Sequence, residues 1–267
     1  MYKDLRDNFT LTKLGDKKLT IGMTTRNGGA STPPFSSLNL GLHVHDKKET
    51  VVQNRGKVAS AINFPLNNWV CADQVHDTVI KEVTTLDLGK GVYDYEDAIK
   101  GTDGLYTKEA DILLTAAFAD CVPLFFAVED PAIVAIAHGG WKGTTSKIAA
   151  KMIEQLQNKE DILAENVHVY IGPSIGACCY EVDNRVIEQV NKSCENNHLS
   201  YETTSNGYML DLKELNRQIL IEAGVIEQHI SISPYCTSCQ NELFFSHRKE
   251  NGSTGRMFGF IGMKQED

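Results

Sequence analysis

Three residues of types that zinc favours, His76, Cys121 and His138, stand in three separate segments of the chain. Each lies at or just beyond the end of an apolar run, where a strand would deliver its side chain and a loop would leave space around it. Two imidazoles and one thiolate leave the fourth tetrahedral position open, which is typical of a catalytic zinc ion. Taken singly, each has an ordinary explanation as a polar loop residue or a small buried hydrophobe. Together they predict a catalytic metal site.

Charged residues elsewhere in the chain extend this chemistry. Asp120 precedes Cys121 at the end of a strongly apolar run, where a carboxylate is costly unless it has a partner. We therefore expect Asp120 to have a partner, and it is also a candidate proton donor or acceptor. A lone arginine is more often a solvated surface charge, but its guanidinium suits a phosphate or carboxylate. Arg26, Lys142 and Arg248 are therefore the cations that we expect to bind an anionic co-substrate.

Four further cysteines stand in two pairs. Cys236 and Cys239 form a CxxC pair, but no second CxxC exists, which excludes a zinc ribbon built from two such pairs. Cys178 and Cys179 would diverge if they were neighbours on a strand, and could then not easily bind one ion. Both pairs are expected to be structural, with Cys239 the one more suited to line a pocket. The sequence favours a turn at Asp103 and surface positions for the histidines at 43 and 45.

The composition is that of an ordinary globular protein. The 267 residues are 42% hydrophobic and 23% charged, with a net charge of −9 that argues against a general nucleic-acid binder. No apolar run approaches the roughly 18 residues of a membrane span, and the polar start over residues 1–7 lacks a signal peptide's apolar stretch. Seven cysteines without such a signal favour reduced thiols. We expect a cytoplasmic protein that binds neither membranes nor nucleic acids.

Hydrophobic periodicity predicts strands and helices that mix without strict alternation along the chain. We therefore expect a mixed α/β (α+β) fold with a single domain over residues 1–267. Helices are expected over residues 47–64, 144–157, 184–194 and 212–223. Strands are expected over residues 19–25, 69–72, 78–83, 111–118, 122–128, 132–137, 167–171, 230–233, 243–246 and 256–261.

Uncommon motifs occur in an order that resembles the laccase-domain family, whose members are also named polyphenol oxidase, purine nucleoside phosphorylase and peptidoglycan editing factor. The resemblance covers about residues 20–262. The motifs that carry it are Thr24-Thr-Arg-Asn-Gly-Gly, Ser37-Leu-Asn-Leu-Gly, Gln74-Val-His, Thr102-Asp-Gly-Leu, Ala119-Asp-Cys-Val-Pro, Ala137-His-Gly-Gly-Trp, Ile171-Gly-Pro-Ser-Ile-Gly, Cys179-Tyr-Glu-Val and Phe244-Phe-Ser-His-Arg.

The resemblance implies a layered sandwich of helices around two mixed β-sheets, with zinc bound by His76, Cys121 and His138. Two positions depart from the family pattern. Lys142 stands where the family usually has arginine, so a phosphate contact there would be less directional. His45 stands where the family typically has glycine, and we assign it no role.

The family names imply different chemistries, which the residues help to rank. A multicopper oxidase needs a larger set of histidines than the eight scattered through this chain, although a His₂Cys site can bind Cu²⁺. A zinc-dependent purine nucleoside phosphorylase for the adenosine, inosine and methylthioadenosine class fits better, with adenosine deamination as a related activity. Its partners would be a purine nucleoside and phosphate. The metal trio and Asp120 would be catalytic, and Asn39 and Gln74 would contact substrate.

Three other functions remain open. Cys121 could be the nucleophile of an amidase or hydrolase that acts on cell-wall precursors, with a histidine as its base. A copper-dependent polyphenol oxidase would use the same trio with another metal. A zinc-dependent partner-binding module would need the metal to fold but would turn over no substrate. The sequence leaves the choice between a monomer and a homodimer open.

Overall fold

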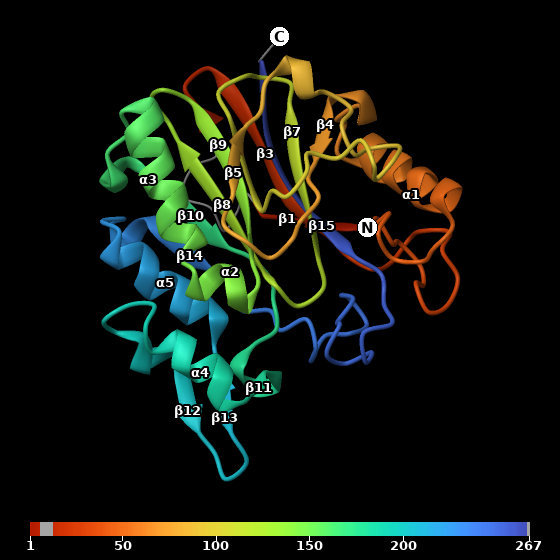
Figure 1. Cartoon of the computed structure of the whole chain (residues 1–267). Coiled ribbons are helices and arrows are strands. Elements are labelled where there is room, and N and C mark those ends of the chain that lie inside the picture. The colour runs from red at the N-terminus through yellow and green to blue at the C-terminus, as the bar shows by residue number, and fades with distance from the viewer. Residues whose placement is uncertain (6–12, 266–267) are drawn as a thin grey trace.

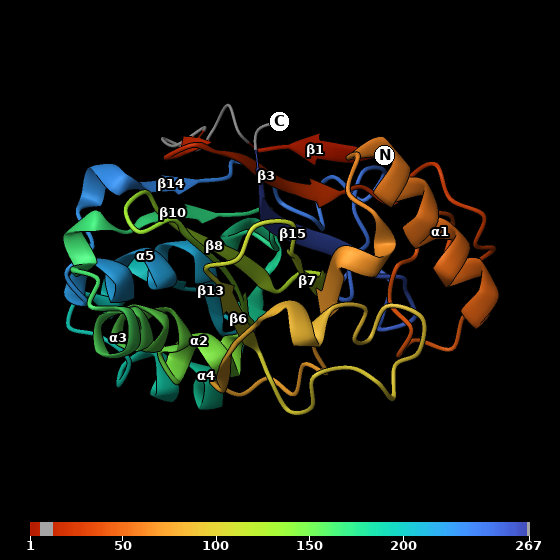
Figure 2. The same cartoon turned by 90° about the horizontal axis from the view of Figure 1, so that it is seen from above.

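The computed structural model describes residues 1–5 and 13–265, so the polar start over residues 1–7 lies only partly within the described residues. Two large β-sheets stack face to face, and helices cover their outer faces (Figure 1 and Figure 2). The predicted mixed α/β fold, a layered sandwich of helices around two mixed sheets, is therefore confirmed. A third, three-stranded sheet was not predicted.

The first large sheet has the strand order β1-β3-β15-β7-β4, with β2 beside β3. Adjacent strands in this sheet are antiparallel, except for β4 and β7, which are parallel. Its strands are β1 (Tyr2–Asp4), β2 (Lys13–Leu14), β3 (Lys17–Thr24), β4 (Trp69–Cys71), β7 (Leu113–Phe118) and β15 (Met257–Gln265).

The second large sheet has the order β14-β10-β8-β9-β6-β5. Its central strands are antiparallel, and the pair at each edge is parallel. Its strands are β5 (Ile80–Glu82), β6 (Gly104–Thr107), β8 (Val122–Val128), β9 (Ile133–Gly139), β10 (His168–Ile171) and β14 (Ile230–Ile232).

Strand β8 shows why the central strands are continuously apolar. Successive side chains of a strand point to opposite faces of its sheet. Val122, Leu124 and Phe126 pack with the helices, whereas Phe125 and Ala127 pack with the first sheet. Both faces are buried, so no position of the strand is free to be polar.

Helix α1 (Lys48–Ala61) covers the first sheet, and α3 (Ile148–Glu160) and α5 (Leu212–Glu222) lie over the second (Figure 2). The single helix predicted over residues 144–157 is instead two helices, α2 (Trp141–Thr145) and α3. The break comes at Lys147, whose left-handed backbone (φ 63°) cannot continue a right-handed helix.

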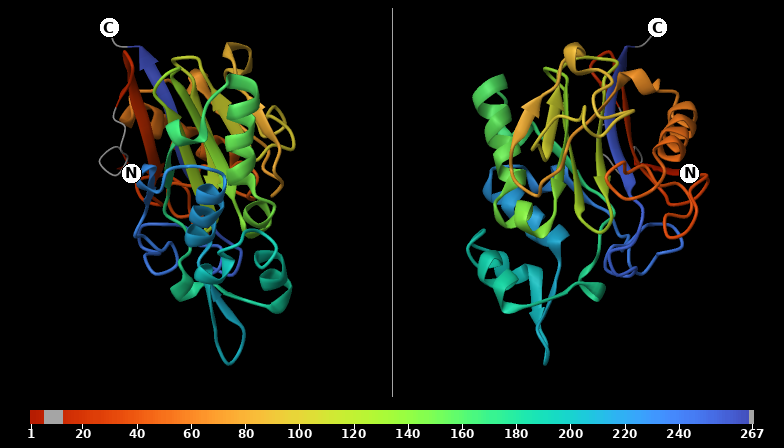
Figure 3. Two further views of the ribbon diagram at one scale, coloured as in Figure 1. Left: turned by 90° about the vertical axis from the view of Figure 1, so that its left-hand side faces the viewer. Right: turned by 45° about the vertical axis from the view of Figure 1, so that its right-hand side comes forward.

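The third sheet and α4 (Asn184–Val190) project from the end of the sandwich at which α2 lies (Figure 1 and Figure 3). Its strands are β11 (Glu181–Val182), β12 (Tyr201–Thr203) and β13 (Tyr208–Leu210). The strand predicted over residues 243–246 was wrong, because these residues form turns and irregular structure. Their apolar side chains are nevertheless core residues, and Phe244 and Phe245 are fully buried. In the part of the chain that the structure describes, no helix has the length and apolar character needed to span a bilayer.

Candidate metal centre

His138 lies near the end of β9 and points into the space between the two large sheets. Val134 and Ile136, four and two residues earlier, pack in the core cluster between the sheets. The two-residue period of the strand places His138 on the same face. Its ring lies 5.6 Å from the ring of Phe118, which belongs to the first sheet. The imidazole is therefore held by packing on both sides and is 3% exposed.

The other two members of the trio come from the connections by which the chain crosses between the large sheets. His76 lies between β4 and β5, and Cys121 lies between β7 and β8. Both connections pass the end of β9, so the three side chains meet. Their ligand atoms all lie within 4.8 Å of one another, and the two imidazole rings are 4.7 Å apart. His76 is exposed and Cys121 is half-buried, so the group opens toward solvent on one side.

Asp103 organises both histidines, although the sequence indicated only a turn there. Its carboxylate accepts a hydrogen bond from Nδ1 of His138 at 2.9 Å. It also accepts backbone N–H bonds from Val75, His76 and Asp77 at 2.9–3.1 Å. His138 is thereby left with Nε2 as its ligand atom, as in carboxylate–histidine–zinc arrangements. Asp103 belongs to the motif Thr102-Asp-Gly-Leu, one of those that carry the family resemblance. That motif could have pointed to this role, which reasoning from residue type alone missed.

Gly140 leaves room for the trio, because any larger residue would intrude on it. A Cβ atom at this position would lie 2.9 Å from Cδ2 of His76 and 3.1 Å from Sγ of Cys121. These distances are shorter than ordinary van der Waals contacts. The trio and the glycine that follows His138 therefore form one packed unit.

The charged groups in this unit stabilise one another in their ionised forms. Burial by itself would raise the pKa of Cys121, but attraction by His138 and hydrogen bonds from His138 and His76 lower it to about 6. Burial would lower the pKa of His138, but the Cys121 thiolate and Asp103 raise it to about 9. Burial would also raise the pKa of Asp103, but hydrogen bonds from His138 and the backbone hold it below its usual value. Without a metal, the centre therefore holds a thiolate beside an imidazolium.

The donor set fits a divalent metal ion. Two imidazoles and a thiolate suit Zn²⁺ and can also bind Cu²⁺. Among the described residues, no fourth histidine, cysteine or acidic side chain joins this cluster. A tetrahedral ion would therefore keep one position for substrate or water.

The trio lines a cavity of about 560 Å³, which is in the size range of small-molecule sites. The cavity also receives four of the other side chains singled out from the sequence, Gln74, Asp120, Lys142 and Arg248. Sequence reasoning missed several further lining residues. Those with polar side chains include His43, Arg55, Tyr95, Tyr180, His247 and Arg256.

Asp120 is held rigidly where the chain turns from β7 toward β8. Its backbone is left-handed, with φ 84°. Its carboxylate accepts hydrogen bonds from Thr237 Oγ1 at 2.6 Å, Ser246 Oγ at 3.1 Å and the backbone N–H of Arg248 at 2.7 Å. The sequence argument that a carboxylate here needs partners is therefore confirmed. These partners connect the β7–β8 turn to the segment that carries Arg248.

The cationic side chains that line the cavity differ in their contacts with the rest of the protein. Arg248 lies over the Tyr180 ring at 4.9 Å and donates to the Glu181 carbonyl at 3.0 Å. Lys142 is 5.8 Å from the Trp141 ring. The side chain of Arg55 is buried and donates to three backbone carbonyls, which makes it a structural cation. The described side-chain hydrogen bonds of Arg256 go only to the carbonyls of the two preceding residues, 254 and 255.

Arg26 and Asn39 do not line this cavity. Arg26 forms an ion pair with Glu250 at 3.0 Å and packs over the Phe245 ring at 4.6 Å. Asn39 is fully buried, and its Oδ1 accepts the backbone N–H of Arg256 at 2.9 Å. Each therefore supports a segment that carries a cavity arginine. Gln74 does line the cavity, but both ends of its amide bond the backbone of Ala117.

The four cysteines near the cavity do not lie as the sequence predicted. Cys178 and Cys179 were expected on a strand with diverging side chains, which was wrong because they lie on a 3₁₀ turn, η5 (Ala177–Cys179). Their sulfur atoms converge with those of Cys236 and Cys239. Cys239 does not line the cavity beside the trio. His45 is exposed, in keeping with the predicted surface position.

The fold and this site define a mixed α/β protein with a His₂Cys group that could hold a metal ion. The family model described as multi-copper polyphenol oxidoreductase laccase matches residues 20–264, so the chain belongs to that laccase-like family. The chain is 48% identical to the purine nucleoside phosphorylase YlmD of Geobacillus stearothermophilus over 92% of this chain and 90% of the relative. It is 47% identical to YlmD of Bacillus subtilis, over 95% and 92% of the two chains.

Solved structures share the fold. The crystal structure of YlmD from Geobacillus stearothermophilus superposes with a TM-score of 0.90 at 47% identity, covering 92% of each chain. The hypothetical protein YfiH of Bacillus licheniformis gives 0.91 at 46% identity, covering 92% of this chain and 93% of that one. The resemblance seen in the sequence motifs is thereby confirmed at the level of the family and its fold.

Proposed function

We propose that the protein is a zinc-dependent purine nucleoside phosphorylase. The observation that carries this proposal is the convergence of His76, Cys121 and His138 in a 560 Å³ cavity that is also lined by three cationic side chains besides the buried Arg55. The names of the most similar relatives support the same reaction. The substrates would be adenosine, inosine and methylthioadenosine, with phosphate as the second reactant.

The trio would hold the zinc ion, with Asp103 fixing the tautomer of His138. When bound, the ion supplies a Lewis acid that polarises an oxygen or nitrogen of the substrate. Copper would fit the same donors. Zinc is the proposed native metal.

Phosphate would bind to Lys142, Arg248 and Arg256. Their positive charges lie in one cavity of a chain whose net charge is −9, and this local concentration favours the binding of an anion there. In phosphorolysis, a phosphate oxygen attacks C1′ of the ribose, and the bond from C1′ to the purine nitrogen breaks. Neutralising the phosphate lets it approach the sugar, and holding it in line with the leaving base lowers the entropy cost of the reaction.

The purine would lie against the aromatic side chains of Trp141 and Tyr180, which line the same cavity. Gln74 would line the substrate cavity with its amide held by the backbone of Ala117, so that it shapes the wall beside the substrate. Asp120 lines the same cavity and would carry the proton of the reaction, as its donor or acceptor. Arg26 and Asn39 would act on substrate binding through the segments that they hold.

The reaction is tested by incubating zinc-loaded protein with adenosine, with and without phosphate. Adenine and ribose 1-phosphate formed only with phosphate would support phosphorolysis. Inosine formed in both samples would show deamination, the related activity in which water replaces the amino group at C6. The proposal is wrong if neither product forms with adenosine, inosine or methylthioadenosine while the protein holds stoichiometric zinc.

A second candidate is a cysteine amidase or hydrolase that acts on cell-wall precursors. It rests on the placement of half-buried Cys121 within 4.8 Å of two histidine nitrogen atoms. Metal-free protein separates the two functions. A nucleophilic Cys121 would be alkylated rapidly and would hydrolyse its substrate without metal, whereas the phosphorylase would require zinc. Phenol oxidation that appears only after copper loading would instead support the oxidase.

The seven cysteines are all free, which fits a reducing compartment such as the cytoplasm. Light scattering of the purified protein would decide between the monomer and the homodimer that we left open.

A further inference from the structure

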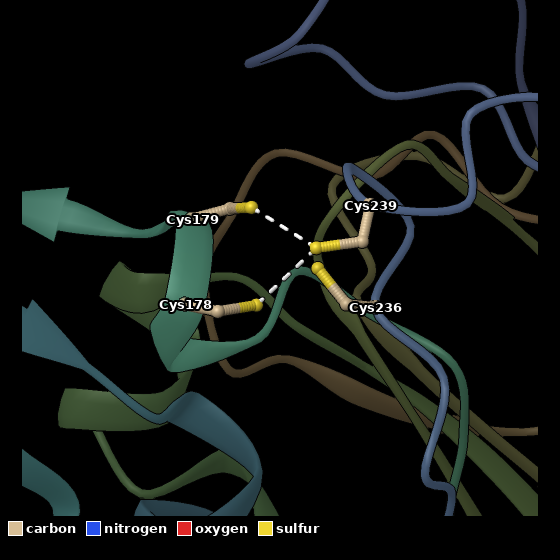
Figure 4. Close-up of side chains that lie close together, drawn as sticks. All are labelled: Cys178, Cys179, Cys236 and Cys239. Carbon is tan, nitrogen blue, oxygen red and sulfur yellow. Dashed lines mark hydrogen bonds between the residues drawn. The ribbon is translucent and has the colours of Figure 1, made fainter.

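Four thiols meet on the outer side of the cavity wall, apart from the His₂Cys trio. Cys178 and Cys179 come from the η5 turn, and Cys236 and Cys239 come from the turn that follows β14 (Figure 4). Their sulfur atoms all lie within 4.8 Å of one another. Cys239 lies at the centre of the group, 3.5 Å from Cys178 and 3.4 Å from Cys179.

The backbone brings these residues together through two tight turns. In η5, the amide of Cys179 donates to the Gly176 carbonyl at 3.0 Å, which closes the turn and places consecutive thiols on one side. In the second turn, the amide of Gln240 donates to the Cys236 carbonyl at 3.0 Å. A bridge between Ser174 and Cys236 joins the two segments.

The sulfur distances fit a single tetrahedral ion and not disulfides. A disulfide bond is about 2.05 Å long, and the cysteines are all free. Four sulfur atoms at about 2.3 Å from a zinc ion lie about 3.8 Å apart. The observed 3.4 and 3.5 Å separations and the 4.8 Å limit bracket this value. Small side-chain rotations would therefore bring the four thiols to zinc-binding positions.

Surrounding groups favour negative charge on the sulfur atom of Cys236. The backbone N–H of Gly176 donates to Sγ of Cys236 at 3.2 Å. The ammonium group of Lys213 donates to the carbonyls of Ser233 and Tyr235, directly before Cys236, and its charge interacts with Cys236 and Cys178. Four thiolates around one Zn²⁺ carry a net charge of about −2, which Lys213 partly offsets. Hydrogen bonds and charges of this kind tune metal–thiolate sites.

We propose that Cys178, Cys179, Cys236 and Cys239 bind a structural zinc ion. Four sulfur ligands complete the tetrahedron and leave no position for substrate, in contrast to the His₂Cys centre. The four deprotonated thiols supply the ligands, and their protons pass to solvent when the ion binds.

The position of this cluster explains what the ion would stabilise. It would clamp the segment that contains Ile175 and Tyr180, both of which line the catalytic cavity, to the segment that contains Thr237. Thr237 donates through its amide to the Ser174 carbonyl and through its hydroxyl to Asp120. The structural ion would therefore hold the cavity wall that carries Asp120 and Tyr180.

The metal content of protein purified with reductant and then incubated with zinc tests this proposal directly. The two clusters predict two zinc ions per wild-type chain. The His76→Ala/His138→Ala variant should keep one ion, and the Cys236→Ser/Cys239→Ser variant should also keep one. Cys194→Ser is the matched control, because Cys194 is buried outside both clusters, and it should keep two.

X-ray absorption at the zinc edge of the His76→Ala/His138→Ala protein identifies the ligands without relying on enzyme activity. We expect four sulfur neighbours at about 2.3 Å and no nitrogen. If the Cys236→Ser/Cys239→Ser variant fails to fold, the single change Cys178→Ser, made in the His76→Ala/His138→Ala protein, replaces it. That variant should show three sulfur neighbours or lose the ion.

Three results would overturn the proposal: no zinc ion in the His76→Ala/His138→Ala variant, iron in place of zinc, or a disulfide among these four residues in the reduced, zinc-treated protein. None of these results bears on phosphorolysis at the His₂Cys centre. Conversely, an inactive protein with two zinc ions per chain would disprove the proposed function and leave the structural zinc ion in place.

Discussion

Asp103 accepts a hydrogen bond from Nδ1 of His138 at 2.9 Å while its two carboxylate oxygens also accept the backbone amides of residues 75–77. One buried side chain therefore fixes the tautomer of one candidate ligand and the loop that carries the other histidine. Because this loop leads from β4 to β5, the carboxylate joins the ends of the two large sheets at the His₂Cys group.

Replacing Asp103 with asparagine should lower zinc affinity at the His₂Cys centre about 10- to 100-fold, the usual effect of losing such a partner. Asparagine has a side chain of the same size, but its NH₂ group would face N–H donors and could not accept their hydrogen bonds. Competition with a chromogenic chelator measures the affinity. Asp87→Asn removes another buried carboxylate remote from the trio and should leave the affinity unchanged.

Replacing Gly140 with alanine should displace the metal ligands, because the new methyl group would lie 2.9 Å from the His76 ring and 3.1 Å from the Cys121 sulfur. Relief of this overlap should cost about 1–3 kcal/mol and lower zinc content. The control is Gly56→Ala in α1, where the methyl group would be 3.9 Å from Leu66 and the helix should gain stability. Equal zinc content in both variants would contradict this account of Gly140.

Replacing Arg248 with alanine should raise the KM for phosphate about tenfold or more, since a hydrogen bond to a charged group contributes about 1.5–3 kcal/mol. Initial rates at varied phosphate give this constant. Arg248→Lys should recover part of the loss, because lysine keeps the charge without the guanidinium fork. Lys249→Ala removes the next, exposed charge and should leave the KM unchanged.

Replacing Arg26 with glutamine should destabilise the protein by about 1–3 kcal/mol. The change would leave Glu250 without its ion-pair partner at 3.0 Å, and Glu250 also holds Ser246 and Thr254 by hydrogen bonds. Urea unfolding measures the loss. Arg185→Gln removes a more exposed arginine and should change stability little. If Arg26 contacted phosphate directly, its replacement would raise the KM for phosphate while leaving stability unchanged.

The stacked pair His168 and His229 should make the protein sensitive to acid. Their rings are 3.8 Å apart, and burial followed by repulsion from His229 lowers the pKa of His168 from 6.5 to about 4. The unfolded chain binds this proton more readily, so the contribution to stability is full above about pH 6.5 and falls as the pH drops toward 4. Wild-type protein should lose thermal stability across this window.

The His168→Gln variant should lose less thermal stability than wild type between about pH 7.5 and about pH 5, because it lacks this titration. Differential scanning calorimetry at both pH values measures the difference. His198→Gln, which changes an exposed histidine, should behave as wild type. An identical pH dependence in all three proteins would contradict the prediction.

The residues alone predicted that His76, Cys121 and His138 would meet, because ligand preference is a property of residue type and the three stand at the ends of recognisable apolar runs. The same runs predicted most strands, since a strand buried on both faces must be apolar throughout, as β8 is. Lys147 shows the limit of periodicity: a left-handed residue breaks the helix, while the apolar pattern continues through it.

Only the tertiary structure decided which groups surround the trio. Asp103 and Arg256 reach the centre through pairings between distant segments, which no local pattern records. The four-cysteine cluster also depends on pairing between distant segments. Cys178 and Cys179 face one way because their backbone forms a 3₁₀ turn, and they meet Cys236 and Cys239 because Ser174 pairs with Cys236 across 62 positions of sequence. Residue types set the chemistry that is available, and long-range backbone pairing set which of these residues meet.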